Sequence, residues 1–258
     1  MGQNSITYEQ PLNEAMRICL RLESLFQQLN EYRHQPSVSS SQIALTALLK
    51  ALNVIDRPDL RPKLTQTLTQ QSIALSQLER SPHVDHKKLS DLLQHVNQLI
   101  DQLHHSPGKI GESLRNNPFL NQIRLHLLNP SGPCNFTTPA YSLWLEQSSE
   151  MRIVNLQQWA SVFDQLNNIV TTLLRITRDS ATAQKAITQN GLYQQSLDPN
   201  ASCQLIRLTL PVSDRIDPEI SVGKHRLVIR LWELDTQQDN PNQNISKDVA
   251  FDLSICRM

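Results

Sequence analysis

Glycine is scarce in this chain of 258 residues: only six occur, and no three are spaced as Gly-x-Gly-x-x-Gly. The sequence also lacks the Gly-Lys-Ser/Thr end of a phosphate-binding loop and the Gly-x-Ser-x-Gly turn of serine hydrolases. Phosphate-binding loops need glycine because their backbone must approach the ligand closely. These absences argue against nucleotide binding, and we predict that the protein is not an enzyme.

Cysteine and histidine do not form a metal-binding pattern. The four cysteines are far apart and include no Cys-x-x-Cys pair, which favours reduced thiols over a disulfide framework or a zinc site. Of the eight histidines, His83, His86 and His95 are close in sequence, but no zincin-type motif connects them and surface histidines explain them better. We predict no metal and no cofactor.

Long apolar runs are absent, and no stretch reaches the roughly 20 apolar residues of a membrane span. The opening Met-Gly-Gln-Asn-Ser-Ile has no basic segment leading to an apolar one, and Ile6 stands where a myristoylation signal needs Ser or Thr. Lys plus Arg equals Asp plus Glu at 24 each, which gives little long-range attraction to nucleic acid or anionic lipid. We expect a cytoplasmic protein without membrane insertion and without a nucleic-acid partner.

From residue 8 to about 127 the apolar residues recur at steps of three and four, which is typical of packed helices. The opening segment, Tyr8–Leu29, has the pattern of one amphipathic helix entered through Pro11. The spacing predicts further helices over residues 45–55, 60–78, 89–103, 110–115 and 118–128. Asp56-Arg57-Pro58 ends the second of them, because the residue before proline is disfavoured in the helical region.

The pattern changes after residue 128. Residues 129–139 are too rich in proline and turn formers for a helix, and Tyr141–Leu145 alternates like a strand. A long helix over 151–178 follows, with an apolar seam from Leu156 to Leu173. Beyond it the period becomes two, which predicts strands over 184–189, 192–196, 205–210, 226–234 and 250–256. Asn190-Gly191 predicts a hairpin between the first two strands, and 235–246 reads as a polar hairpin loop.

These patterns predict an α+β fold, with a helical bundle domain and a smaller antiparallel β-sheet domain. The helical domain is predicted to comprise residues 1–128 and 149–178, and the β domain residues 129–148 and 179–258. The apolar seams on the helices at 89–103 and 156–173 exceed what one short bundle needs. They favour dimerisation through the helical domain.

One predicted strand concentrates positive charge on one face. Alternation places Lys224, Arg226 and Arg230 on the solvent side of the strand, together with Val228 and Trp232. With a rise of about 3.3 Å per residue, the two arginines stand roughly 13 Å apart. Such a face suits a short peptide that carries carboxylates and a few apolar side chains.

Other interpretations of this strand stay open. Its cations could be a solvated face paired with acids such as Asp217 or Glu233. A nucleic-acid-binding module that uses the same strand, with Trp232 stacking on bases, is the alternative function. Arg207 would extend the patch if its strand is a neighbour.

Several separate segments carry a family resemblance. Pro11-Leu-Asn-Glu-Ala-Met-Arg17 is followed after two residues by Leu-Arg-Leu-Glu, and further matches occur in order along nearly the whole chain. In this combination the sequence resembles the ZapD (Z-ring-associated protein D) family of bacterial division proteins, which bind FtsZ. The further matching segments are Ile110–Arg115, Pro130–Cys134, Leu143–Leu145 and Asn190–Tyr193.

The resemblance implies a homodimeric adaptor at the mid-cell division ring. Such an adaptor binds the C-terminal tail of FtsZ, cross-links and bundles FtsZ filaments and stabilises the Z-ring. The family is thought to receive the tail in a basic pocket made by arginines of one strand and one at the end of the second helix. Carried over by matching positions, the pocket residues are Arg57, Lys224, Arg226, Arg230 and, with a weaker match, Arg61.

Overall fold

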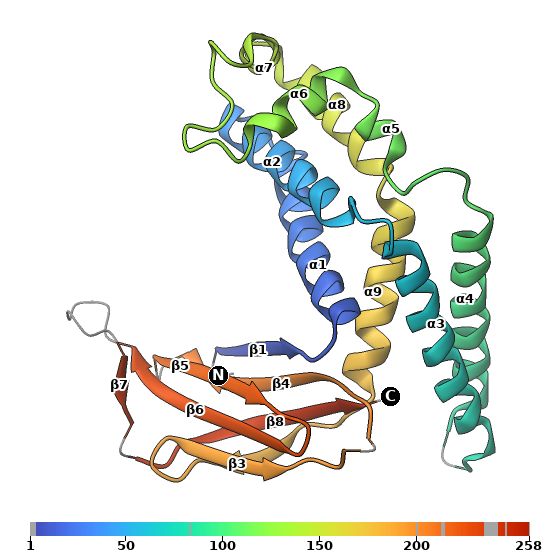
Figure 1. Cartoon of the computed structure of the whole chain (residues 1–258), viewed down its shortest axis with the longest axis vertical. Helices are drawn as coiled ribbons and strands as arrows, with labels where there is room; N and C mark the ends of the chain where they lie inside the picture. The colour runs from blue at the N-terminus through green and yellow to red at the C-terminus, as the bar shows by residue number, and fades with distance from the viewer. Residues whose placement is uncertain are drawn as a thin grey trace. The chain divides into compact units, whose positions relative to one another are not determined.

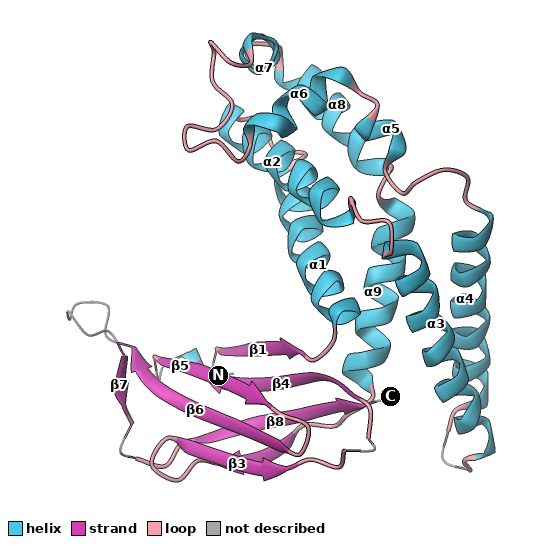
Figure 2. Cartoon of the chain, in the orientation of Figure 1, coloured by secondary structure: helices cyan, strands magenta, loops and turns pink. Residues whose placement is uncertain are grey.

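The computed structural model describes residues 4–82, 84–199, 201–212, 215–234, 242–245 and 247–257. The chain divides into two compact units. One, here called the β unit, comprises Met1–Arg17 and Arg175–Met258, and the other, the helical unit, comprises Ile18–Leu174. Figures 1 and 2 show the helices and the two antiparallel sheets, and the predicted α+β fold class is confirmed.

Helices account for the regular structure of the helical unit, and α1 and α9 cross its boundary to reach the β unit. A single 3₁₀ turn, Leu78–Arg80, follows α3. The helices are α1 Glu14–Tyr32, α2 Val38–Ile55, α3 Leu60–Gln77, α4 His86–His105, α5 Glu112–Arg115, α6 Pro118–His126, α7 Pro139–Leu145, α8 Ser149–Ser161 and α9 Asp164–Asp179.

Helix α2 lies in the core of the helical unit. Its N-cap Ser37 accepts a hydrogen bond from the Ser40 backbone N–H at 3.0 Å, which satisfies one of the free donors of the first turn. Leucines and alanines fill the buried side, and Leu48, Leu49 and Leu52 are fully buried. By length and composition α2 is apolar enough to cross a membrane, yet 56% of it is buried inside the structure, as in a core helix.

Helices α3 and α4 pack side by side (Figure 1). Asp85 caps α4 by accepting a hydrogen bond from the Lys88 N–H at 3.1 Å. The apolar stripe of α4 is buried within the chain, at Leu89, Leu93, Val96, Leu99 and Leu103. The seam predicted over 89–103 therefore packs inside the helical unit.

The β unit contains two antiparallel sheets, ordered β1-β4-β8-β2 and β3-β6-β5, with β7 also paired to β6. Alternate residues of both sheets form one apolar cluster, to which β4 contributes Ile206 and Leu208, β6 Leu227 and Ile229, and β8 Phe251. The strands are β1 Ser5–Pro11, β2 Gln184–Ile187, β3 Leu192–Ser196, β4 Cys203–Pro211, β5 Ile216–Val222, β6 Arg226–Leu234, β7 Asn242–Asn244 and β8 Ala250–Arg257.

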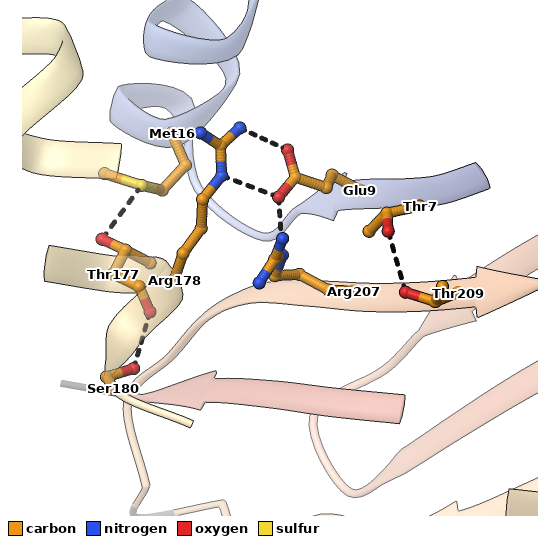
Figure 3. Close-up of polar contacts among 8 residues, drawn as sticks. All are labelled: Thr7, Glu9, Met16, Thr177, Arg178, Ser180, Arg207 and Thr209. Atoms are coloured by element: carbon orange, nitrogen blue, oxygen red, sulfur yellow. Dashed lines mark hydrogen bonds and ion pairs between the residues drawn. The ribbon is translucent and has the colours of Figure 1, made fainter. Parts of the chain in front are cut away.

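A partly buried ion cluster joins the first strand to the last turn of α9 within the β unit (Figure 3). The Glu9 carboxylate on β1 accepts hydrogen bonds from Arg178 Nε at 2.9 Å and Nη2 at 2.6 Å, and from Arg207 Nε at 2.8 Å. The Glu9 side chain is only 15% exposed. Arg207 is also the register partner of Glu9 on β4, so this cluster fixes three elements together.

The predicted opening helix is wrong over its first part. Residues Ser5–Pro11 form β1, which pairs along its whole length with β4. The helix begins at Glu14, where the Asn13 side chain accepts a hydrogen bond from the Met16 N–H at 2.9 Å. A capping asparagine, and not Pro11, is the start signal that the structure uses.

Two other predictions about the middle of the chain are wrong. Tyr141–Leu145, predicted as a strand, lies in α7, whose first residue is Pro139. The single helix predicted over 151–178 is two helices, α8 and α9, with a turn at Val162 and Phe163. There the Phe163 N–H donates to the Ala160 carbonyl at 2.9 Å, and the Phe163 ring packs on Phe26.

The Asn190-Gly191 turn forms, but it does not close the predicted hairpin. A single isolated bridge joins Gln189 to Leu192, after which β2 pairs with β8 in one sheet and β3 pairs with β6 in the other. The turn therefore passes the chain between sheets. Residues 235–241 and 246 of the predicted polar loop lie outside the described residues, as does His83.

All five strands predicted after residue 178 are confirmed, at β2, β3, β4, β6 and β8, while β5 and β7 were not predicted. Pro218 interrupts the apolar pattern of β5, but the strand lies at a sheet edge, where proline is tolerated. The predicted division placed 129–148 with the strands, whereas these residues lie in the helical unit, and the first 17 residues lie in the β unit.

Candidate functional site

A pocket of about 470 Å³ lies in the helical unit, where α2 ends, α3 begins and the loop before α5 returns. Its lining combines apolar side chains with four cations and one carboxylate. The lining residues are Ile55, Asp56, Arg57, Pro58, Leu60, Arg61, Pro62, Gly108, Lys109, Ile110 and Arg115. The structure therefore brings Arg57 and Arg61 together.

The two predicted arginines are held differently. Arg57 lies in the turn after α2, and its Nε stands 3.7 Å from Asp59 Oδ1, with 39% of the side chain exposed. Arg61, in the first turn of α3, donates to the carbonyls of Ser106 at 2.8 Å and Gly108 at 2.6 Å. Arg61 thus fixes the loop that forms one wall of the pocket, while Arg57 is the more exposed of the two.

The pocket contains two further cations that were not among the predicted site residues, Arg115 and Lys109. Arg115 donates to the carbonyls of Ile110 at 2.6 Å and Ile55 at 3.3 Å, and its Nε lies 3.2 Å from Asp56 Oδ1. Lys109 is exposed on the loop. The only signal for them in the sequence was the family-matching segment Ile110–Arg115. Their place in the pocket depends on a tertiary contact between the end of α2 and this loop, which no local pattern predicts.

Asp56 is the one acid among the described residues of the pocket lining. A hydrogen bond from Arg124, which outweighs the effect of burial, lowers its pKa, and the charges of Arg124, Arg115 and Lys109 add to this effect. Asp56 is therefore ionised at neutral pH. The lining carries four cations against one carboxylate, so the pocket is positive overall.

Gly111 lets the loop approach the core. Its φ is +74°, and a Cβ there would stand 3.0 Å from both Ile55 Cδ1 and Leu52 Cδ1 and 3.6 Å from Phe163 Cε1. Only glycine combines this left-handed conformation with so close an approach. This close approach brings the neighbouring Lys109 and Ile110 to the pocket.

The second set of predicted residues lies on β6 in the β unit and at its start. The predicted alternation is confirmed, since Arg226 and Arg230 are exposed while Leu227, Ile229 and Leu231 are buried. Lys224 is also exposed, but it lies in the turn before β6.

Few acids oppose this face. Within the described ranges, no carboxylate lies within 4 Å of Lys224, Arg226 or Arg230. Glu219 on β5 is the register partner of Arg230, and Asp217 is that of Trp232. The two arginines thus share the face with two neighbouring acids that do not pair with them, and Lys224 lies in the turn just before the strand. Arg230 and Trp232 also border a hollow of about 140 Å³ beside the Asn190-Gly191 turn.

Arg207 does not extend this patch. Its strand, β4, belongs to the other sheet, and its guanidinium is bound by Glu9. The five predicted residues therefore fall into two sets, Arg57 with Arg61 in the helical unit and Lys224 with Arg226 and Arg230 in the β unit. That the two sets act as one pocket stays a prediction.

No group of three or more His, Cys, Asp or Glu in the described part of the chain is arranged to hold a metal ion. The cysteines described are free thiols. Burial raises the pKa of Cys19 to about 12, with a further contribution from the charge of Glu23, so that this thiol stays protonated at neutral pH. The exposed cations of the pocket and of β6 are suited to binding negatively charged groups.

The fold and these solvent-facing cations define an α+β protein that presents positive charge in both of its units. A family model named ZapD and described as a cell division protein matches residues 20–230. A protein named cell division protein ZapD from Coxiella burnetii (strain RSA 331 / Henzerling II) is 55% identical over 258 residues, which is 100% of both chains.

More distant relatives with the same name also match along the whole chain. The protein from Nitrosomonas eutropha is 33% identical over 255 residues, covering 98% of this chain and 100% of that protein. The protein from Cupriavidus pinatubonensis is 34% identical over 254 residues, covering 97% and 99%. The chain belongs to the ZapD family.

Proposed function

We propose that this protein binds the acidic C-terminal tail of FtsZ and, as a homodimer, cross-links and bundles FtsZ filaments. It would thereby stabilise the Z-ring from the cytoplasm at mid-cell. The observation that carries the proposal is the exposure of Arg226 and Arg230 on one strand face without a paired acid among the described residues. Membership in a cell division family supports the same role.

The chemistry fits an acidic peptide. An arginine presents a planar fork of N–H donors that matches a carboxylate, and charge-assisted hydrogen bonds of this kind are stronger than neutral ones. The partly exposed Arg57 in the pocket of the helical unit offers the same fork, with Arg61 and Lys109 beside it. We expect each tail to bind weakly through a few such contacts.

Bundling requires two sites on one body, which a homodimer supplies. After one tail is captured, the second capture occurs at high effective concentration because a filament presents many tails. The apolar seams that suggested dimerisation are largely buried within the chain. Exposed apolar side chains on α6, α7 and the segment between them support a contact between copies instead, namely Leu125, Leu128, Phe136 and Leu143.

The first prediction concerns the strand. We expect the double variant Arg226→Glu/Arg230→Glu to abolish co-sedimentation with FtsZ polymers, because it makes the net charge of this face more negative by four units and so repels an acidic tail. Both side chains are exposed, so the change should not disturb the fold. The circular-dichroism melt should stay as in the unchanged protein. A collapsed melt would show that these side chains are structural.

Matched controls sharpen this test. Arg80→Glu/Lys87→Glu removes the same charge from exposed positions outside both cationic surfaces and should retain co-sedimentation. Deleting the FtsZ tail should remove binding as fully as the double variant does. Full binding by the double variant, or a monomer in sedimentation equilibrium at micromolar concentration, would contradict the proposal. Tight binding of a single-stranded oligonucleotide in fluorescence anisotropy would favour the nucleic-acid alternative.

A further inference from the structure

A second cavity of about 250 Å³ adjoins the cationic pocket of the helical unit. The two cavities share Arg61, Lys109 and Ile110, which form the partition between them. The remaining residues of the second cavity come from the end of α4, the loop before α5, the α8–α9 turn and α9. They are Leu103, Ser106, Pro107, Gly111, Val162, Gln165, Leu166 and Ile169.

The floor of the second cavity is apolar. Leu103, Leu166 and Ile169 are 2%, 2% and 1% exposed, so they form a fixed surface continuous with the core. Val162 is half-buried at the α8–α9 turn. The polar groups of Ser106 and Gln165 bond to each other, with Gln165 Nε2 donating to Ser106 Oγ at 3.3 Å.

The charges around the cavities favour an acidic occupant. Four cations line the first cavity, and three acids lie nearby: Asp56, Asp59 and Glu112. Arg115 and Arg124 bind Asp56. Asp59 pairs with Arg57 and Lys63. The Glu112 carboxylate accepts a hydrogen bond from the Lys109 backbone N–H at 2.9 Å. Among the described residues, no acid lines the second cavity.

We infer that the helical unit holds a two-part peptide site: a carboxylate enters the cationic pocket, and an aliphatic side chain of the same peptide enters the adjoining cavity and packs on its apolar floor. This rests on the proposed function only for the class of partner, an acidic peptide. A cavity of about 150 Å³ already accommodates a benzene ring, so a leucine side chain fits the space. The apolar side chain would confer selectivity that charge alone does not give.

The test uses synthetic peptides and fluorescence anisotropy on the full chain. Labelled ten-residue peptides carry three Asp and one Leu placed one to four residues from the nearest Asp, and each has a counterpart with Ser in place of Leu. Burial of the leucine should make at least one Leu peptide bind about tenfold or more tightly than its Ser counterpart. Equal binding across all pairs would overturn the inference.

Val162→Phe is the matching change on the protein, because the ring fills the cavity and alters no charge. It should remove the preference for Leu while leaving the Ser peptides bound as before. Ile73→Phe is the control, since it adds a ring at a 57% exposed position of α3 and should keep the preference. If Val162→Phe lowers the melting temperature, the comparison of peptides on the unchanged protein still decides the question.

The FtsZ tail peptide separates this inference from the proposed function. A Leu preference of the synthetic peptides without binding of the FtsZ tail supports the two-part site and contradicts FtsZ as the partner. Equal binding of the FtsZ tail to the unchanged protein and to Val162→Phe, with no Leu preference, overturns the two-part site and leaves the proposed function standing.

Discussion

Glu9 is the least exposed acid in the ion pairs described for this chain, and two arginines share it. Burial acts to raise the pKa of Glu9, but the hydrogen bond and charge of Arg178, together with those of Arg207, lower it below the ordinary value of 4.5. A carboxyl whose pKa is lower in the folded state stabilises the fold above its unfolded pKa. That stabilisation is lost as the pH falls through the folded value.

Glu9→Gln should therefore reduce the free energy of unfolding at pH 7 by about 1 to 3 kcal/mol, because two guanidinium groups lose their charged acceptor. The difference from the unchanged protein should shrink as the pH falls below 4.5. Denaturant titrations at a series of pH values measure both effects. Glu31→Gln, at an exposed position of α1, is the matched control. A difference that grows in acid would show that the Glu9 cluster does not act in this way.

The surroundings of a single residue could be predicted when they are set by its neighbours in the sequence. The exposure of Arg226 and Arg230 followed from strand alternation, because neighbouring residues of a strand face opposite sides. The ion cluster of Glu9 and the place of Arg115 could not be found in the same way. Each needs segments that are distant in sequence, and no local pattern encodes such a contact.

At the scale of elements, Arg152 joins three segments of the helical unit. Its side chain is 5% exposed and donates hydrogen bonds to Ser41 Oγ at 3.1 Å, to the Pro36 carbonyl at 2.8 Å and to the Leu145 carbonyl at 3.1 Å. It also donates to the Gln147 carbonyl. The guanidinium thus ties α8 to the start of α2 and the end of α7.

Arg152→Ala should lower the free energy of unfolding by about 3 kcal/mol, because a buried charged donor is lost and several acceptors are left without a partner. Arg152→Lys should lose most of the same energy, since one ammonium cannot reach the oxygens of all four acceptor residues. Denaturation followed by circular dichroism measures both variants. Arg80→Ala, at an exposed position, should change stability by no more than about 0.5 kcal/mol. Equal stability of all three variants would contradict this role for Arg152.

Elements were predicted best where one period extended over many residues, as for α3, α4 and β6. Short segments were predicted less well, because tertiary contacts decide their structure. Asn190-Gly191 formed its turn as the sequence predicted, but the partners of β2 and β3 come from β8 and β6. The local sequence does not show that pairing with these distant strands is more stable than pairing of β2 with β3 in a hairpin.

At the scale of the whole molecule, the proposed bundling should depend strongly on salt. Raising the salt concentration from about 0.1 M to about 1 M shortens the screening length from about 10 Å to about 3 Å, which weakens contacts between exposed charges. Bundling needs two captures, so it should disappear at a lower salt concentration than the binding of a single tail peptide. Light scattering and anisotropy in one salt series measure the two.

Thermal melts in the same buffers serve as the control for that series, because the protein must stay folded throughout. Bundling that persists at about 1 M salt would indicate an apolar contact with the filament in place of a charged one.

The pairing of β1 with β4 has a consequence for how the chain is made. Ser5 lies opposite Pro211, and the whole helical unit is encoded between them. During synthesis the first strand leaves the ribosome long before its partner exists, whereas the helical unit is complete once Leu174 has emerged. The first strand must therefore wait unpaired until β4 has emerged, so this sheet is assembled after the helical unit.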